Sequence, residues 1–470
     1  MAFLIAIGVI AGAVWGTYLA LRGSLVLGGV LYLILACCLG VYFWNVDVAG
    51  ITFSLDRFFL VMLMGALFVQ WRLGQTQSRS TTAADWLLVA FVVWITASAF
   101  THDWRASNAG QVPIIQHLIN GYYIPLALYF LARQVRLHEG NVNAVHNGLA
   151  MFGVYLAVIG LLEAAGQWSL VFPRYIADPE LGLHFGRSRG PMVHAVSYGS
   201  YLGACLICTW IWCERASRTG KLLLTVCALA ILAAVFFTKT RTVWLGVGAS
   251  VFLLLALTLR GRVRVLALGA LTATALLVGV AKLDAILGLQ REGTVADTRE
   301  SASMRKSFTY VSWLMFKDRP LCGFGFGQFA TAKLPYLSDR TVDLHLESIR
   351  TYVHHNTFLS ILTETGLIGL GLFLAVLLQW ARYGWRLARD GHAPRWMQCQ
   401  ALLLLGVLCI ASSQMIGHEI TFTPLDMSLI FFCAGLTTAL AQQQGHAASV
   451  HLRGHVAQHN APAPVMSAPR

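Results

Sequence analysis

Long apolar runs separated by short polar loops occupy most of this 470-residue chain. Several runs approach the roughly 20 residues that an apolar helix needs to cross a lipid bilayer. The pattern predicts about thirteen spans, or about twelve because the first hairpin is tight and the fifth segment is polar. The predicted spans are Ala2–Leu21, Ser24–Trp44, Arg57–Trp71, Asp85–Phe100, Pro113–Ala132, Val145–Gly166, Met192–Cys213, Lys221–Phe237, Thr242–Leu259, Arg264–Ala281, Thr357–Trp380, Met397–Ile416 and Pro424–Ala441.

The composition agrees with a chain that lies in a membrane. Hydrophobic residues make up 57% of the sequence and charged residues only 12%, about half the charged fraction of a soluble protein. The net charge is +13 and the isoelectric point about 9.5, but the basic residues are spread through short loops, as the positive-inside rule predicts. We therefore expect an all-α, polytopic membrane protein with no nucleic-acid partner.

The basic loops also predict which ends of the spans face the cytoplasm. If the loop at Arg22 is cytoplasmic and the spans alternate, the richly basic loops all share its side, and the opposite short loops hold far fewer basic residues. The long polar segment then lies on the outer face of the membrane. The cytoplasmic set comprises Arg72, Arg79, Arg133, Arg136, Arg215, Arg218, Lys221, Arg260, Arg262, Arg264, Arg382, Arg386, Arg389 and Arg395.

Four regions follow from this division. Residues 1–281 are predicted to form an N-terminal transmembrane bundle, 282–356 a large, partly helical periplasmic loop, and 357–441 the C-terminal transmembrane helices. Residues 442–470 are rich in Ala, His, Gln and Pro and lack the apolar content of a core. We expect this last region to be a disordered cytoplasmic tail.

Two histidines stand where the long loop runs into an apolar helix. Asn356 suits the N-cap of that helix, because its side-chain oxygen can accept a free backbone N–H of the first turn. The cap predicts that His355 faces water beside the positive end of the helix dipole, where an imidazole can take a proton from a sugar hydroxyl. His354 and His355 could also bind zinc, but no third ligand stands at helical spacing, so no metal site is predicted.

Basic residues near the predicted periplasmic surface form a second pattern. Taken singly, each of them is explained by contact with lipid headgroups. As a set on the same side as the histidine pair, they favour a site for a diphosphate, because guanidinium groups bind phosphate oxygens in a bidentate way and stay charged. A polyprenyl diphosphate that carries a sugar is the expected ligand. The set comprises Arg187, Arg189, Lys239, Arg241 and Arg305.

Two features of the loop and helix leave alternatives open. Glu364 lies about two turns after Asn356 inside a predicted span. A carboxylate there is costly and indicates function, whereas the alternative is a buried acid that fixes helix packing.

The glycines of Gly323–Gly327 match a phosphate-binding loop only loosely, since no strand precedes them. A turn whose backbone packs closely against its surroundings is the preferred interpretation.

Three stretches resemble the O-antigen ligase and polymerase family of bacterial membrane glycosyltransferases. His355-Asn356, followed by Glu364-Thr365-Gly366 and Gly369, is similar to the helix after that family's large periplasmic loop. Thr240-Arg241-Thr242, continued to Gly246, is similar to its short periplasmic hairpin, although Ser-Arg-Gly is commoner there. The third stretch, similar to the loop signature, comprises Arg305, Trp313, Pro320, Gly323, Gly325, Gly327 and Phe329.

The resemblance implies a GT-C-like helical bundle that transfers a glycan from undecaprenyl diphosphate to an acceptor hydroxyl. The acceptor would be the lipid A core in a ligase, another lipid-linked repeat in a polymerase, or a serine or threonine in a protein-linked member. The family's catalytic histidine corresponds to His355 and its two key arginines to Arg241 and Arg305. The predicted substrate-binding residues are Arg187, Arg189, Lys239, His354, Asn356 and Glu364.

The predicted chemistry requires no cofactor. The carrier diphosphate is already an activated leaving group, so neither a nucleotide nor a metal is needed, and attack from the opposite face would invert the anomeric centre. Two other classes stay open, a lipid-linked glycan flippase or other transporter, and a scaffold subunit of a polysaccharide export complex. Transporters tend to carry ionisable groups near the midplane and internal repeats. Here most charges lie at span ends and no repeat is visible, so the enzyme is favoured.

Overall fold

The computed structural model describes residue 16 and residues 21–48, 51–105, 112–183, 185–281 and 295–459. The first predicted span, Ala2–Leu21, lies largely outside this part of the chain. The same holds for residues 282–294, where the predicted periplasmic loop begins, and for the last residues of the predicted tail, 460–470.

Helices make up nearly all of the regular structure in the described residues, as the hydropathy pattern predicts. Nine of the described helices are long and apolar enough to cross a membrane, which confirms an all-α, multi-pass membrane protein. Each predicted span from Ser24 onward coincides with a helix. These helices are α2 (Leu25–Cys38), α3 (Leu55–Arg72), α4 (Ala83–Phe100), α5 (Ile114–Leu118) continued by a π-helical turn (Ile119–Tyr123) into α6 (Ile124–Gln134), α7 (Glu139–Ala164), α8 (Ala195–Arg215), α9 (Arg218–Phe237), α10 (Arg241–Thr258), α11 (Gly261–Ala281), α15 (Thr357–Arg389), α16 (Arg395–Gly417) and α17 (Pro424–His459).

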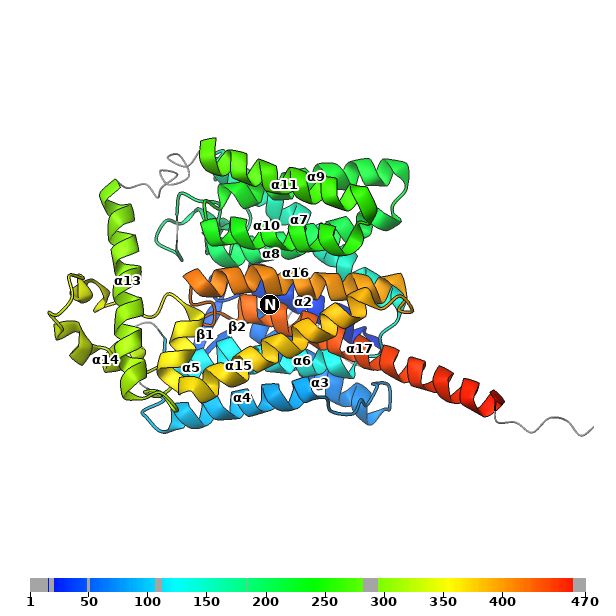
Figure 1. Ribbon diagram of the computed structural model, residues 1–470, viewed down its shortest axis with the longest axis horizontal. Helices are drawn as coiled ribbons and strands as arrows, with labels where there is room; N and C mark the ends of the chain where they lie inside the picture. Colours follow the sequence, from blue (N-terminus) through cyan, green and yellow to red (C-terminus); the bar gives the residue numbers. More distant parts are fainter. Residues whose placement is uncertain are drawn as a thin grey trace, which may run out of the picture.

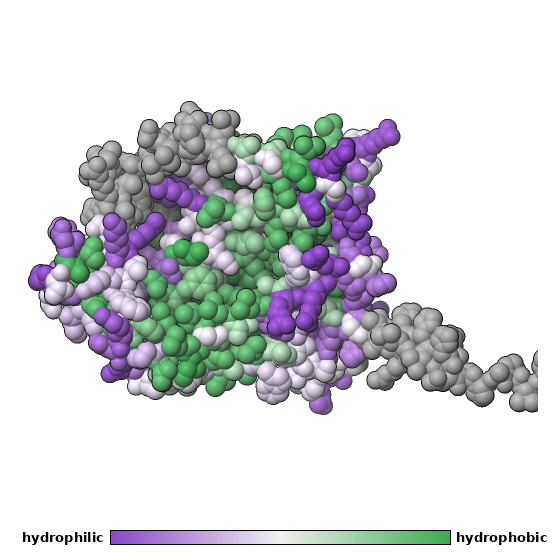
Figure 2. Space-filling model, viewed as in Figure 1, coloured by the Kyte–Doolittle hydropathy of each residue, from purple (hydrophilic) through white to green (hydrophobic). Residues whose placement is uncertain are grey.

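The surface of the bundle is apolar in its middle and polar at its two ends. Figure 2 shows green, hydrophobic residues over the centre of the face and purple, hydrophilic residues gathered at the left and right. Helix α9, for example, leaves Leu222 and Leu223 69% and 64% exposed. Apolar side chains so exposed need lipid rather than water around them. Helices α8, α16 and α17 are instead mostly buried and form the centre of the bundle.

A polar layer covers the end of the bundle where α15 begins. It contains the antiparallel strands β1 (Asn45–Val48) and β2 (Ile51–Ser54), which lie between the predicted spans Ser24–Trp44 and Arg57–Trp71 and were not expected. Helix α13 (Val295–Asp318) runs across this end of the bundle, with the short α14 (Phe329–Ala332) beside it (Figure 1). The long loop is therefore partly helical, as predicted. It also has a small apolar core of its own, made of Phe308, Val311, Met315, Phe329, Leu337, Leu346 and Ile349.

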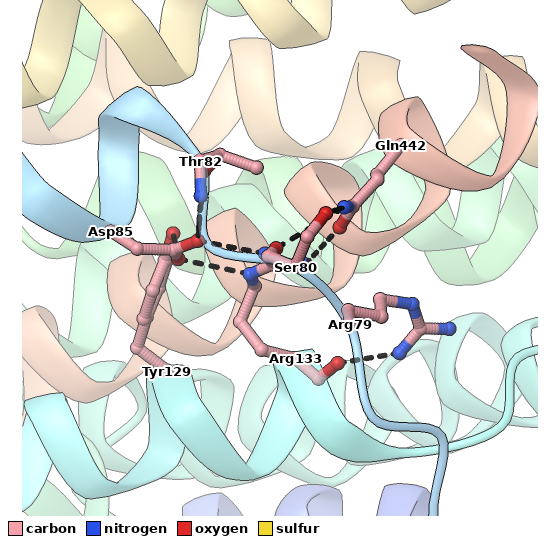
Figure 3. A network of polar contacts seen from close by, with 7 residues as sticks. All are labelled: Arg79, Ser80, Thr82, Asp85, Tyr129, Arg133 and Gln442. Atoms are coloured by element: carbon pink, nitrogen blue, oxygen red, sulfur yellow. Dashed lines mark hydrogen bonds and ion pairs between the residues drawn. The ribbon is translucent and has the colours of Figure 1, made fainter. Parts of the chain in front are cut away.

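A buried ion pair joins three helices at the opposite end of the bundle (Figure 3). Arg133 of α6 donates from Nε and Nη2 to the two carboxylate oxygens of Asp85 in α4, at 2.9 and 2.7 Å. Tyr129 donates to the same carboxylate at 2.7 Å, and Arg133 Nη1 reaches Gln442 of α17 at 3.2 Å. A bidentate guanidinium–carboxylate pair fixes both side chains in one geometry, so this network sets the relative positions of α4, α6 and α17.

Gln442 lies at the start of the region predicted to be a tail. Residues 442–459 continue α17 as a helix. Ala and Gln are good helix formers, and Gln442 is also held by the carbonyl of Ser80, to which its Nε2 donates at 3.1 Å. The helix extends past the bundle in Figure 1.

Candidate active site

A break in α15 joins the long loop to the membrane bundle. Gly366 has φ 70° and ψ −167°, far from helical values. The break frees two N–H groups of the helix, and the loop accepts them: Leu367 donates to the carbonyl of Pro320 at 2.8 Å and Ile368 to that of Leu321 at 3.3 Å. A side chain at Gly366 would meet Leu321 O at 2.1 Å, so only glycine fits this position.

The glycine-rich segment Gly323–Gly327 of the loop packs against the same break in α15. Gly323, Gly325 and Gly327 all have positive φ, and a Cβ on Gly323 would lie 2.5 Å from the main-chain carbon of Glu364. Phe324 and Gly325 donate to the helix carbonyls of Thr363 and Glu364, at 3.0 and 2.9 Å. The preferred interpretation of this run as a close backbone turn agrees with these contacts.

The Glu364 carboxylate is used by the loop backbone. Its two oxygens accept hydrogen bonds from the N–H groups of Gly327 and Phe329, at 2.9 and 3.2 Å, and the residue is only 3% exposed. A carboxylate that receives two N–H groups in this way is already satisfied. The geometry therefore assigns Glu364 to fixing the loop on α15, in place of the predicted contact with substrate.

His354, which the sequence predicts to bind substrate, lies inside the loop. It is 2% exposed, its Nε2 hydrogen-bonds to the hydroxyl of Ser312 at 2.8 Å, and its ring lies against Phe329 and Phe308, at centroid distances of 4.4 and 5.5 Å. Burial lowers the pKa of His354 to about 3. The imidazole is neutral at physiological pH and helps to hold the loop.

His355 stands at the start of α15, where the sequence predicts it. The side chain of Asn356 accepts the N–H of Leu359 at 2.9 Å and so forms the expected N-cap. Its amide also donates 2.8 Å to the carbonyl of Ile416 in α16. His355 itself is exposed and contacts Phe308 edge-on, with ring centroids 5.3 Å apart. The cap and the α16 contact fix the backbone on which this imidazole is carried.

A cavity of about 730 Å³ opens beside His355. Arg305 of α13 and His354 line it from the loop, and further walls come from α2, α3, α5 and the segment 417–425 between α16 and α17. The cavity therefore unites Arg305 and His355, two of the three residues predicted to carry the chemistry. Its size is that of a site for a small or medium-sized ligand.

Arg241 lies at the rim of this region. It is exposed at the first position of α10. The carbonyl of its neighbour Thr242 accepts from Ser413 at 2.8 Å, and the Thr242 side chain packs on Gly417, which lines the cavity. Arg241 is not among the residues that line the cavity, but α10 begins next to the cavity wall, so a long guanidinium side chain starts close to it.

Arg189 has a structural position that differs from the predicted one. Its side chain is fully buried and donates to the carbonyls of Ile176 and Asp178, at 3.1 and 2.6 Å, and to that of Leu181. Its own N–H is accepted by Glu163 of α7 at 3.0 Å. Arg189 therefore holds the segment before α8 in its fold, and its guanidinium is directed at main-chain carbonyls, away from a diphosphate site.

Arg187 and Lys239 lie together beside the α9–α10 hairpin. Ser188, next to Arg187, donates its N–H to the carbonyl of Phe237 at 3.0 Å, and Lys239 reaches the carbonyl of Gly186 at 3.4 Å. Lys239 is one of two described non-glycine residues with positive φ, at 47°. Lys239 shares the hairpin with Arg241 and Arg187 lies beside it, although neither Arg187 nor Lys239 lines the cavity.

Three charged residues of the cavity wall were not predicted as site residues. Asp56 and Arg57 in α3 and Glu419 between α16 and α17 all line it. Glu419 accepts from the hydroxyls of Thr421 and Thr357, at 2.6 and 3.3 Å, and burial raises the pKa of its carboxyl. The signal for Arg57 was its place at the first turn of an apolar span, where a charge is uncommon. Nothing in the sequence marked Glu419 as a site residue except its position near the end of a predicted span.

Comparison with known proteins identifies one family. Residues 226–374 match the family model described as O-Antigen ligase, and this range includes Arg241, Arg305, His355 and the break in α15. No curated protein matches the chain. The matched range coincides with the part of the sequence that carries the three family-like stretches, so the predicted resemblance is confirmed.

Proposed function

Because residues 226–374 match the O-antigen ligase family model, we propose that the chain transfers a glycan from undecaprenyl diphosphate to an acceptor hydroxyl on the periplasmic face of the inner membrane. The match supports glycosyltransferase-type activity on lipid-linked glycans and acceptor substrates in a membrane. The lipid A core or a related acceptor is the proposed second substrate.

The observation that carries this proposal is the shared cavity of Arg305 and His355. A permanently charged guanidinium and an exposed imidazole line one volume of about 730 Å³ beside the first turn of α15. The guanidinium can bind the diphosphate, and the imidazole can accept the proton of the attacking hydroxyl. These are the two groups that such a transfer requires, one for the leaving group and one for the nucleophile.

The residues divide the reaction between them as follows. Arg305, with Arg241 from the rim, stabilises the negative charge that grows on the diphosphate as the glycosidic bond breaks. His355 removes the proton of the acceptor hydroxyl as that oxygen attacks the anomeric carbon. The pair Arg187 and Lys239 adds positive charge near the hairpin. Attack opposite to the leaving group inverts the anomeric centre, and the diphosphate departs without a nucleotide or a metal.

Replacing the histidine tests the proposal. His355→Ala, shown by size exclusion and thermal melting to be folded, is expected to lose about 100- to 10,000-fold in transfer rate, the usual contribution of a general base. His392→Ala is the matched control, because His392 is an exposed histidine in the turn between α15 and α16. Normal glycan transfer by a folded His355→Ala protein would refute the role of His355.

A polymerase that joins lipid-linked repeats is the alternative within the same chemistry. Analysis of the glycans in a cell that lacks this protein distinguishes the ligase from the polymerase. Loss of long glycan from lipid A indicates a ligase, and accumulation of single lipid-linked repeats indicates a polymerase. A flippase is tested in proteoliposomes without acceptor, where movement of labelled lipid-linked glycan with no bond exchanged would favour transport.

A further inference from the structure

Arg57 is a cavity cation that belongs to the N-terminal half of the chain, outside the range that matches the family model. It lies in the first turn of α3, directly after β2. Only 6% of the residue is exposed, yet it lines the same cavity as Arg305 and His355. The cavity therefore receives positive charge from a helix of the bundle as well as from the loop.

Neutral amides hold the Arg57 guanidinium. Its Nη2 donates to Oδ1 of Asn120 at 2.7 Å. The amide of Gln116, turned so that its oxygen faces the guanidinium, accepts from Nη1 and Nη2 at 3.0 and 2.7 Å. Asn120 lies in the π-helical turn between α5 and α6, one helical turn from Gln116. The two amides fix the direction of the guanidinium without neutralising it.

The positive charge of Arg57 has no ion-pair partner among the described residues. Asp56, the neighbouring carboxylate, accepts instead from the hydroxyl of Ser54. The Nε of Arg57 is buried and makes no hydrogen bond in the described part of the chain. A buried charge that has no ion pair is costly, and so is a buried donor that has no acceptor. An anionic ligand in the cavity would offset both.

We propose that Arg57 is an anion-binding residue that receives a phosphate group of the substrate in this cavity. The inference rests on the proposed function, because it assigns the anion to the lipid-linked donor or its acceptor. The two amides take both hydrogens of Nη2 and one of Nη1, which leaves the Nε–H, one Nη1–H and the full positive charge of a guanidinium in a fixed position for phosphate oxygens. The phosphate can come from two sources, the diphosphate of the carrier or a phosphate on the acceptor glycan.

The test measures binding and transfer separately, in purified full-length protein in nanodiscs. The probe is undecaprenyl diphosphate without glycan, added with no acceptor present. Arg57→Met keeps the length of the side chain and removes the charge, and it is expected to weaken binding of the probe at least tenfold. Arg57→Lys keeps the charge but loses the guanidinium that Asn120 and Gln116 hold in place, and it is expected to show a smaller loss.

Arg79→Gln is the matched control. Arg79 donates to the main-chain carbonyls of Arg133 and Val135, at the opposite end of the bundle (Figure 3). Its loss should leave binding of the probe unchanged. If Arg57→Met binds the probe normally but raises the KM for the acceptor, the phosphate belongs to the acceptor and the inference still holds.

Normal binding and a normal acceptor KM in a folded Arg57→Met protein would overturn the inference. Where Arg57→Met fails to fold, wild-type binding and a wild-type acceptor KM in Arg57→Lys would overturn it, since the guanidinium that the two amides hold would then be unnecessary. These outcomes are distinct from a failure of the proposed function. A wild-type protein that binds the carrier but transfers no glycan would contradict the proposed reaction and leave the comparison of Arg57 variants valid.

Discussion

Asn356 donates a hydrogen bond of 2.8 Å from its side-chain amide to the main-chain carbonyl of Ile416. This bond joins the N-terminus of α15 to the last turn of α16. His355 directly precedes Asn356 in the chain. The next residue adds a second bond in the same place, because the hydroxyl of Thr357 donates to the carbonyl of His418 at 2.9 Å. The backbone that carries His355 is thus positioned by α16 as well as by the loop.

Asn356→Asp separates the two roles of this residue. A carboxylate still caps α15, since it can accept the N–H of Leu359, and it suits the positive end of the helix. It cannot donate to Ile416 and repels that carbonyl. We expect a melting temperature close to wild type and a fall in kcat of roughly 10- to 100-fold, because small displacements of a catalytic group are costly. Transfer assays on purified protein measure it.

Asn356→Ala provides the comparison for that experiment. It loses both bonds, so it should also lose about 1 kcal/mol of stability from the missing cap. Full activity of Asn356→Asp would show that the contact with Ile416 does not position His355.

Replacement of Gly366 by alanine should disrupt the contact between α15 and the loop. Alanine there combines a positive φ with a contact of 2.1 Å to Leu321 O, so Gly366→Ala should destabilise the protein by more than about 2 kcal/mol. The loop segment from Pro320 should separate from α15. Thermal melting and limited proteolysis of the loop measure these two effects.

Gly371 lies one and a half turns further along the same helix and provides the control. Nothing lies within 4 Å of a Cβ built there, so Gly371→Ala should be neutral or stabilise α15 by up to about 1 kcal/mol. A Gly366→Ala protein that melts and resists protease like Gly371→Ala would show that the break in α15 is not needed.

The spans were predictable because each apolar run is long compared with the error in its ends. The break at Gly366 was not, since the run Glu364 to Leu372 has the hydropathy of an uninterrupted helix. The cause of the break is the loop, whose carbonyls at Pro320 and Leu321 accept the freed N–H groups. These partners lie more than 40 positions away, and hydropathy carries no information about pairing at that distance.

The candidate site was predictable only where the side chain and its local backbone decide the outcome. The N-cap at Asn356 is such a case. Arg189 is the opposite case, because its basic character and position match those of a phosphate ligand, yet the carbonyls of Ile176 and Asp178 take its donors. Which acceptor an arginine meets depends on the fold of the loop around it, and that fold is set by distant contacts such as Glu163 with the N–H of Arg189.

Glu364→Gln tests whether a carboxylate is required under the loop. The two oxygens of Glu364 each accept one N–H, from Gly327 and Phe329. An amide has one oxygen, so it turns an NH₂ group toward one of these donors and leaves it without an acceptor. We expect a loss of about 1–3 kcal/mol and easier proteolysis of the loop, with thermal melting as the measurement.

Glu347→Gln is the control for this substitution. Glu347 lies on the surface of the same loop, in an exposed ion pair with Arg350, and such pairs contribute little to stability. Its melting temperature should equal that of the wild type. Equal melting of Glu364→Gln and wild type would show that the loop does not depend on the carboxylate, and the functional alternative that the sequence left open would then be favoured.

His354 should make the loop less stable in acid. Burial, with smaller contributions from His355 and Lys333, lowers its pKa to about 3, against 6.5 for a free histidine. The unfolded chain therefore takes up a proton as the pH falls through 6.5, whereas the folded loop does not. Stability is then fully present above pH 6.5 and falls by about 1.4 kcal/mol per pH unit below it, roughly 2 kcal/mol by pH 5.

His354→Phe removes this titration and keeps an aromatic ring against Phe308 and Phe329. The drop in melting temperature between pH 7 and pH 5 should shrink relative to wild type. Ser312→Ala is the matched control, because it removes the hydrogen bond to His354 but leaves the imidazole in place, and it should keep the wild-type slope. Other buried groups, such as His194, contribute equally to all three proteins and cancel in the comparison. An unchanged slope in His354→Phe would mean that the buried imidazole is not what makes the loop sensitive to acid.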